Sequence, residues 1–191
     1  MNNNDYCGAN IKCSIAFKLR ECYSANMKIV NIIGRKNNGK TTLVVALIEA
    51  FWARGLQVGS IKHTSHNYDL DTPGKDSDRH RLAGAVPAAI ISGRHTAVHL
   101  PTPLNDTLCY DHIMPLYAGC DFVLVEGHCA GPGLKLEVWR EKANTEPIAA
   151  TQNDVVAMIT DDPCEIDLPM IPRSDLTQVV DKILNLLDIT S

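Results

Sequence analysis

Short apolar runs alternate with amphipathic segments along this chain, and together they predict its secondary structure. Runs of β-branched and aliphatic residues with the length of strands occupy 28–33, 57–62, 121–126, 134–140 and 155–160. Apolar residues recur at helical spacing over 40–55 and over 174–188, where Ser174 is the expected N-cap. Strands that alternate with helices favour an α/β fold, so we expect a three-layer α/β/α domain with a mainly parallel sheet.

Other segments add detail to this alternation. "VPAAIIS" (86–92) and "HTAVHL" (95–100) flank a Gly-Arg pair, which predicts an added β-hairpin. Much of 105–118 is expected to be helical. "LKLEVWR" (134–140) alternates between apolar and polar residues, so it predicts a strand with one exposed face and an open edge. The polar stretch 63–81 is expected to be a long loop, and loops of that length usually carry a function.

Composition narrows the class of protein. A chain of 191 residues that is 45% hydrophobic can bury a core of ordinary size, and we expect one domain over 27–191, preceded by a disordered extension over 1–26. A net charge of −4 and only 5% aromatic residues argue against a nucleic-acid-binding surface. No apolar run reaches the roughly 18 residues of a membrane helix. The seven cysteines, an odd number without a CxxC pair, indicate free thiols and a cytoplasmic protein.

The segment "GRKNNGKT" (34–41) lies between the first predicted strand and the first predicted helix, and it satisfies the pattern G-x-x-x-x-G-K-[ST]. Glycines let the backbone curl so that successive N–H groups point at phosphate oxygens, and the start of the helix adds its positive end. In this arrangement Lys40 reaches the outer phosphates and the Thr41 hydroxyl can bind Mg²⁺. The segment therefore predicts a P-loop NTPase that binds a nucleoside triphosphate.

A second acidic group is expected on a neighbouring strand, where it completes the surroundings of the metal. Glu126 ends the run 121–126, so it lies at the edge of the sheet where ligands bind in open α/β folds. Asp121 begins the same run and is too far away to share the metal, so it is interpreted as a residue that starts the strand. Gly127 then allows a sharp turn past the nucleotide.

The polar stretch after the second strand gathers ionisable side chains. His63 and His66 could bind a transition metal such as Zn²⁺ or Ni²⁺. In "DTPGKDS" a proline–glycine turn presents Asp71 and Asp76, the candidate catalytic carboxylates, together with Lys75. A loop in this position corresponds to the nucleotide-sensing switches of P-loop GTPases. The alternative is an ordinary solvated loop.

The segments "GRKNNGKTTL", "SIKHTSHNYDLDTPGKDSDRHRLAGA" and "FVLVEGH…LKLEVWR" together resemble the MobB family of molybdopterin-guanine dinucleotide biosynthesis adaptor proteins. The resemblance runs from Met27 almost to the end of the chain. It implies a GTP-binding P-loop protein that forms homodimers and assists a partner nucleotidyltransferase in attaching GMP to molybdopterin. Two departures stand out: Thr64-Ser65-His66 replaces a tighter histidine cluster, and His128-Cys129 stands where a Phe-Lys pair often follows the glycine.

The resemblance also implies site residues. Those expected to bind the nucleotide are Gly34, Asn37, Asn38, Gly39, Lys40, Thr41, Thr42, Lys62, His63, Lys75 and Asp161. Thr41 and Glu126 would bind Mg²⁺, and 71–79 would form a switch-like loop. Asp161 falls where the family carries an aspartate after a late strand. Its carboxylate could accept hydrogen bonds from N1–H and the 2-amino group of guanine, a pairing that adenine cannot offer.

The leading hypothesis is a GTP-binding accessory protein of molybdenum cofactor biosynthesis that uses Mg²⁺ and has weak GTPase activity. Its partner would be the molybdenum cofactor guanylyltransferase, with molybdopterin a further candidate ligand and with no nucleic acid or membrane involved. The open edge predicted for 134–140 also favours a homodimer. Two alternatives stay open. One is a nickel or zinc insertion GTPase that uses His63 and His66, and the other is a P-loop kinase of a small metabolite, for which no Arg-rich lid segment is visible.

Overall fold

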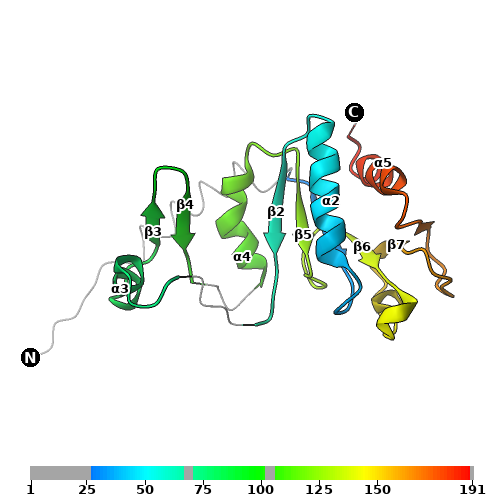
Figure 1. Ribbon diagram of the computed structural model, residues 1–191, viewed down its shortest axis with the longest axis horizontal. Coiled ribbons are helices and arrows are strands. Elements are labelled where there is room, and N and C mark those ends of the chain that lie inside the picture. Colours follow the sequence, from blue (N-terminus) through cyan, green and yellow to red (C-terminus); the bar gives the residue numbers. More distant parts are fainter. Residues whose placement is uncertain (1–26, 67–70, 102–105, 190–191) are drawn as a thin grey trace, which may run out of the picture. The chain divides into compact units, whose positions relative to one another are not determined.

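Six strands form a parallel sheet that organises the structure (Figure 1). This computed structural model describes residues 27–66, 71–101 and 106–189. The strands of the sheet are β1 (Ile29–Ile33), β2 (Val58–Lys62), β5 (Phe122–Glu126), β6 (Leu134–Val138), β7 (Val155–Ile159) and β8 (Met170–Ile171), in the spatial order β2-β5-β1-β6-β7-β8. All the pairs are parallel, so the carboxyl ends of the strands meet at one edge.

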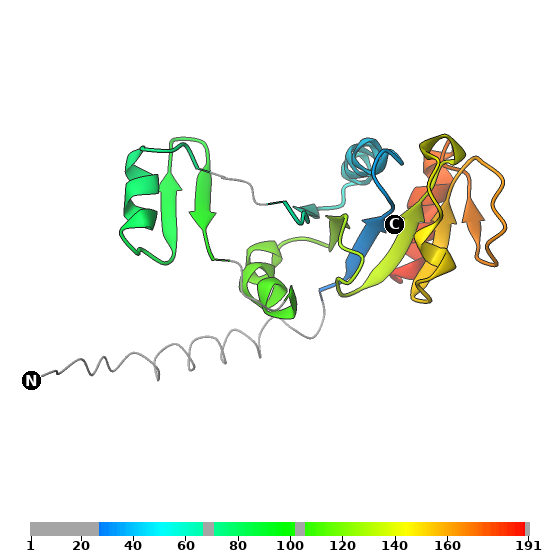
Figure 2. The same cartoon turned by 90° about the horizontal axis from the view of Figure 1, so that it is seen from below.

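Helices cover both faces of this sheet (Figure 2). They are α2 (Lys40–Ala53), α4 (Asp106–Ile113), the 3-10 helix η1 (Met114–Tyr117) and α5 (Leu176–Leu186). On one face α2 and α5 pack against the strands, and the ring of Phe51 meets Phe122 edge to face with centroids 4.9 Å apart. On the other face Val123 and Val125 pack against Tyr110 and η1. Alternate residues of β5 therefore face different helices, and the predicted three-layer α/β/α fold is confirmed.

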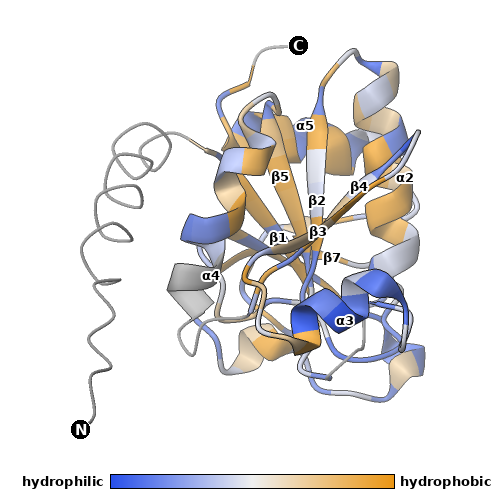
Figure 3. Ribbon diagram, turned by 90° about the vertical axis from the view of Figure 1, so that its left-hand side faces the viewer, coloured by the Kyte–Doolittle hydropathy of each residue, from blue (hydrophilic) through white to orange (hydrophobic). Residues whose placement is uncertain are grey.

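The core lies mainly between the sheet and the pair α2 and α5. The strands β1 and β5 are largely apolar (Figure 3), and Ile32, Leu124, Leu47 and Ile183 are fully buried. Burial on both faces explains why β1 and β5 read as continuous apolar runs in the sequence instead of alternating. Within the described parts of the chain, no helix combines the length and the apolar character needed to cross a bilayer.

The described residues of 64–109 form a second compact unit. It contains α3 (Asp76–Leu82) and an antiparallel pair of strands, β3 (Ala88–Ile91) and β4 (Thr96–His99). The predicted hairpin is therefore confirmed. Among the described strands, β3 and β4 pair with each other and not with the main sheet. The described parts of 27–191 thus form two compact units, and the expectation of one domain stays a prediction.

The prediction that 134–140 is a half-exposed strand with an open edge is wrong. β6 lies inside the sheet between β1 and β7, and Lys135 to Val138 are all buried. The polar side chains of the alternation are buried because they find polar partners from the segment that precedes β7. Lys135 donates to Asp154 at 2.6 Å, and the carboxylate of Glu137 accepts hydrogen bonds from two backbone N–H groups. The open edge therefore no longer supports a homodimer, although the dimer itself stays a prediction.

Smaller differences concern the ends of elements. The N-cap of α5 is Asp175, which accepts a hydrogen bond from the backbone N–H of Gln178 at 3.0 Å, and not Ser174. The expected helix within 105–118 changes to 3-10 geometry at η1, where Pro115 has no N–H to donate. The end of the polar stretch 63–81 is the helix α3 and not a loop. Acidic residues in its first turn and basic residues in its last turn suit the helix dipole.

Candidate functional site

The P-loop connects β1 to α2 at the carboxyl edge of the sheet. Gly34 has a φ of +143° and Gly39 a φ of +83°, values that side chains rarely tolerate. A Cβ on Gly34 would also lie 2.4 Å from the carbonyl oxygen of Val138 on the neighbouring strand β6. Both glycines of the motif are therefore required by the backbone, as the sequence pattern predicts.

Asn38 holds the P-loop against the end of β6. Its side chain is fully buried, and its Oδ1 accepts a hydrogen bond from the backbone N–H of Arg140 at 2.7 Å. Its Nδ2 donates to the carbonyl oxygen of Arg35 and to Oγ1 of Thr145, each at 3.3 Å. The shape of the loop is thus stabilised by contacts to the residues that follow β6.

Lys40 folds back over the loop that precedes it. Its Nζ donates to the carbonyl oxygen of Arg35 at 2.8 Å. Burial lowers the pKa of Lys40, and the nearby charge of Lys62 lowers it further, while Glu126 and Cys129 act in the opposite direction. Burial and the neighbouring Lys62 thus outweigh the favourable effect of the nearby acidic groups on the charged form of Lys40. An anion in the loop would stabilise it and raise its pKa.

Glu126 joins three elements at the end of β5. Its Oε1 accepts a hydrogen bond from the Thr41 hydroxyl at 2.6 Å, and the same oxygen forms an ion pair with Nζ of Lys62. The carboxylate side chain is only 7% exposed. The structure thus brings together the two residues predicted to bind Mg²⁺. A hydroxyl and a carboxylate are the oxygen ligands that Mg²⁺ prefers, and Mg²⁺ completes its shell with water and phosphate oxygens.

Two histidines lie near the end of β5, and one of them contacts a tyrosine. The rings of His63 and His128 are stacked with centroids 3.8 Å apart, and Nδ1 of His128 lies 2.7 Å from the hydroxyl of Tyr110. His128 and Tyr110 were not expected to take part in the site. His66, the other candidate metal ligand, is exposed. Across 27–66, 71–101 and 106–189, no three histidine, cysteine or acidic side chains are grouped to hold a metal ion.

Asp161 lies in a cleft of about 490 Å³ at the exit of β7. The cleft is lined by Arg140, Glu141, Lys142, Asp161, Asp162 and Arg173. Oδ1 of Asp161 accepts hydrogen bonds from the backbone N–H and the hydroxyl of Ser174, both at 2.8 Å. The backbone bond and then the hydroxyl bond lower the pKa of Asp161, so its carboxylate stays ionised. Ser174, predicted to be the N-cap of the last helix, orients this carboxylate instead.

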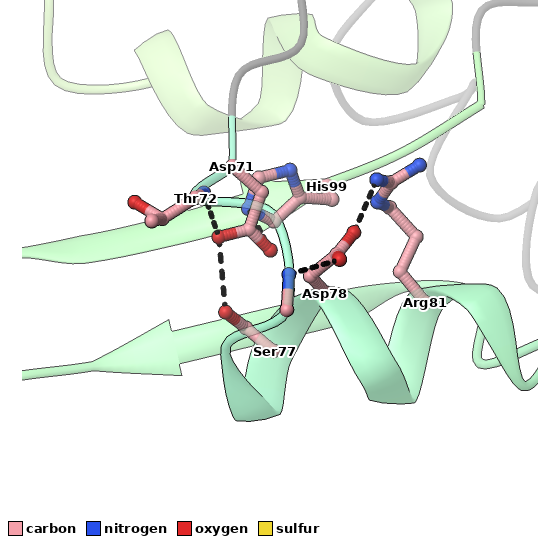
Figure 4. A network of polar contacts seen from close by, with 7 residues as sticks. Asp71, Thr72, Ser77, Asp78, Arg81 and His99 are labelled. Carbon is pink, nitrogen blue, oxygen red and sulfur yellow. Dashed lines mark hydrogen bonds and ion pairs between the residues drawn. The ribbon is translucent and has the colours of Figure 1, made fainter.

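The candidate switch residues form a polar network within the second unit (Figure 4). Oδ1 of Asp71 accepts hydrogen bonds from the N–H of Thr72 at 2.8 Å and from the hydroxyl of Ser77 at 3.0 Å. Asp78 is buried and accepts from the N–H of Gly74 at 2.8 Å and from Arg81 at 2.6 Å. The bond from Gly74, followed by Arg81, lowers the pKa of Asp78. These acids therefore shape the turn that leads into α3.

Lys75 and Asp76, also predicted site residues, are exposed in the same unit. The side chain of Asp76 is 94% exposed, and its Oδ1 lies 3.9 Å from Nη1 of Arg79. An ion pair this exposed contributes little to stability. The side chains of Lys75 and Asp76 are therefore available to a ligand or partner. Their contact with a nucleotide stays a prediction.

Comparisons with known proteins place this arrangement in a family. The family model MobB, described as molybdopterin guanine dinucleotide synthesis protein B, matches residues 29–161. The molybdopterin-guanine dinucleotide biosynthesis adapter protein of Escherichia coli (strain K12) is 34% identical over 146 residues, which cover 75% of this chain and 83% of that protein. The adapter protein of the same name from Haemophilus influenzae is 33% identical over 157 residues, which cover 82% of this chain and 88% of that protein.

The fold agrees with solved structures. The crystal structure of Bacillus subtilis MobB matches with a TM-score of 0.64 at 26% identity, covering 84% of this chain and 98% of that one. The MobB protein homolog from Bacillus stearothermophilus matches with a TM-score of 0.60 at 25% identity, and the match covers 85% of this chain and 99% of that one. The family model spans the P-loop, Glu126 and Asp161. The chain therefore belongs to the MobB family.

Proposed function

We propose that this protein binds GTP together with Mg²⁺ and acts as an adapter in the biosynthesis of molybdopterin guanine dinucleotide. The observation that carries the nucleotide part is the meeting of Thr41 with the buried Glu126 directly behind the P-loop. Backbone groups from Gly34 to Thr42 hold the phosphates, and Lys40 contacts the outer ones. The Thr41 hydroxyl and the Glu126 carboxylate would hold Mg²⁺, which would supply positive charge next to the outer phosphates, and Lys62 is a neighbouring positive charge.

The adapter part is supported by family membership and by the names of the relatives. We infer that the partner is the molybdenum cofactor guanylyltransferase, with molybdopterin as a further ligand. The homodimer is likewise inferred, and light scattering at micromolar concentration measures it. A metal-insertion GTPase or a small-metabolite kinase is not favoured by these comparisons.

Calorimetric titration with GTP, ATP and GDP, each with and without Mg²⁺, tests the proposal. We expect GTP to bind best, and we expect its affinity to fall when Mg²⁺ is removed, because Glu126 and the phosphates then repel each other. Equal affinities for GTP and ATP, or no effect of Mg²⁺, would contradict the proposed nucleotide. We expect hydrolysis of GTP to be slow, and a phosphate-release assay with GTP and Mg²⁺ measures its rate.

Asp161 should read the guanine base. Its exposed carboxylate stands at the ligand edge of the sheet, and Ser174 keeps it ionised. We expect Asp161→Asn to weaken GTP binding by about 1–3 kcal/mol while improving the relative affinity for xanthosine triphosphate, whose 2-oxo group an amide can meet. Competition titrations measure the ratio of the two affinities. Asp162→Asn is the matched control, and a ratio that responds to Asp162 alone would move the base contact by one residue.

The segment 71–79 should respond to the γ-phosphate. Two acids, Asp71 and Asp76, are tolerated near a triphosphate only with Mg²⁺ or Lys75 between them, which would order the segment in the triphosphate state. Hydrogen exchange across 71–81 should therefore be slower with a non-hydrolysable GTP analogue than with GDP, both with Mg²⁺. Equal exchange in the two states would make the segment a static docking surface and would remove Asp71 and Asp76 as catalytic candidates.

A further inference from the structure

Two arginines converge on the last glycine of the P-loop. A Cβ built on Gly39 would lie 2.5 Å from Nη2 of Arg140 and 3.2 Å from Nη2 of Arg173. Both guanidinium groups therefore lie within contact distance of one point on the loop. They arrive from different elements, because Arg140 follows β6 and Arg173 follows β8. Neither belongs to the G-x-x-x-x-G-K-[ST] pattern, and neither was expected in the site.

This arrangement places like charges together with little compensation. Among the described residues, no carboxylate forms an ion pair with Arg140 or Arg173, and Nε of Arg173 is buried without a hydrogen-bond partner. Burial and the neighbouring charge of Arg140 lower the pKa of Arg173, while Asp161 opposes this shift. Buried or half-buried cations normally form ion pairs with carboxylates. Two arginines held together without such a partner therefore cost free energy, and an anion between the two guanidinium groups would remove that cost.

Both arginines are held in place by the protein itself. The backbone N–H of Arg140 is bound to the buried side chain of Asn38, which fixes the start of its side chain against the P-loop. Arg173 directly precedes Ser174, whose hydroxyl and N–H bind Asp161. The pair thus lies between two parts of the proposed site, the P-loop on one side and the base-reading carboxylate on the other. All these residues belong to the same compact unit.

A nucleotide that lies along this path must pass the two guanidinium groups. The outer phosphates of this nucleotide lie in the P-loop and its base lies against Asp161. The part between them, which spans the cleft, is the ribose and the phosphate attached to the ribose. Of these, only the phosphate carries negative charge. Guanidinium groups bind phosphate oxygens through paired N–H donors, which suits two arginines that face one anion.

We propose that Arg140 and Arg173 form an oxyanion site that holds the first, ribose-linked phosphate of the bound guanine nucleotide. The inference rests on the proposed nucleotide function, and it assigns to these arginines a share of the affinity that the P-loop motif does not supply. Because GMP, GDP and GTP all carry this phosphate, the site should contribute equally to the three. The P-loop lysine, in contrast, should distinguish them.

The test measures the affinities of four ligands, which differ in their number of phosphates, for wild type and matched variants. Guanosine, GMP, GDP and GTP compete with a fluorescent guanine nucleotide for wild type, Arg140→Gln and Arg173→Gln. Lys142→Gln serves as the control, because it removes the same charge from the same cleft. Each arginine variant should weaken GMP, GDP and GTP by about tenfold or more, leaving guanosine and the ratio of GTP to GDP affinity unchanged. The control should show a much smaller change.

Stability provides a second measurement. The midpoint of thermal unfolding without ligand should stay constant or rise in Arg140→Gln and Arg173→Gln, because one of two repelling charges is removed. The rise in midpoint on adding GDP should be smaller than in wild type. A merely structural role for these arginines would instead lower the midpoint of the ligand-free protein.

Several outcomes would overturn the inference. Guanosine binding that falls as much as GMP binding would assign the arginines to the base, and a changed ratio of GTP to GDP affinity would assign them to the outer phosphates. If inorganic phosphate stabilises the GTP-saturated wild type but not the arginine variants, the pair serves a second phosphorylated ligand. If the wild type binds no guanine nucleotide, the proposed function falls as well. If Lys40→Ala loses GTP while the arginine variants do not, the inference alone fails.

Discussion

Lys40→Ala should lower the affinity for GTP by about a hundredfold, or roughly 3 kcal/mol, because the ammonium group forms charge-assisted hydrogen bonds with the outer phosphates. The ligand-free protein loses only the hydrogen bond from Lys40 to the carbonyl oxygen of Arg35, so its stability should change by about 1 kcal/mol or less. Calorimetric titration gives the affinity, and circular dichroism shows whether the variant is folded.

Lys36→Ala is the matched control for this experiment. Lys36 is an exposed lysine of the same loop at a variable position of the motif, so its removal changes the net charge equally and leaves the fixed positions intact. We expect it to weaken GTP binding by no more than a few-fold, through long-range attraction alone. A folded Lys40→Ala protein that binds GTP as tightly as Lys36→Ala would contradict the assignment of this segment as a phosphate-binding loop.

Glu137→Ala should be the most destabilising of these substitutions, by about 2–5 kcal/mol. The carboxylate of Glu137 is fully buried and accepts hydrogen bonds from the N–H groups of Ile148 at 2.7 Å and Ala149 at 2.8 Å. Its removal leaves two backbone donors without a partner, each of which costs about 1–3 kcal/mol. Such a loss is a large part of the stability of a typical domain. Denaturant unfolding measures the change.

The pH dependence of stability gives an independent check on Glu137. Burial raises its pKa, and the two N–H groups only partly oppose this. A carboxyl group with a raised pKa in the folded state contributes most to stability below its unfolded pKa, and this contribution is lost as pH rises through the folded value. Glu137→Gln cannot ionise, so its stability relative to wild type should improve as pH rises from acidic to neutral. Denaturant unfolding of both proteins across this pH range measures the difference.

The sequence alone predicted much of the candidate site, because the signals for it are local. Gly34, Gly39, Lys40 and Thr41 are recognised by spacing within one turn between a strand and a helix, and backbone geometry imposes that spacing. Glu126 was found by a second local feature, the end of a buried apolar run. Parallel strands place their carboxyl ends at one edge, so two strand ends predicted separately could be expected to meet.

Strand order, however, was decided by the tertiary structure. The run 134–140 was interpreted as half exposed because alternation reports only which residues share a face, and not what covers that face. β6 is interior, and the segment around 147–154 supplies backbone donors to Glu137 and a carboxylate to Lys135. The pattern of apolar and polar residues within a strand does not show partners from another segment of the chain.

The arginine pair shows the same limit at the site itself. Arg140 ends a predicted strand, so its place at the ligand edge could have been noticed. Arg173 follows β8, a strand of two residues that is too short to produce a pattern. Residues 39, 140 and 173 meet only because β6, β7 and β8 lie side by side in the sheet. A sequence specifies local conformation through nearest neighbours, whereas contacts between charges far apart in the chain depend on the packing of the whole sheet.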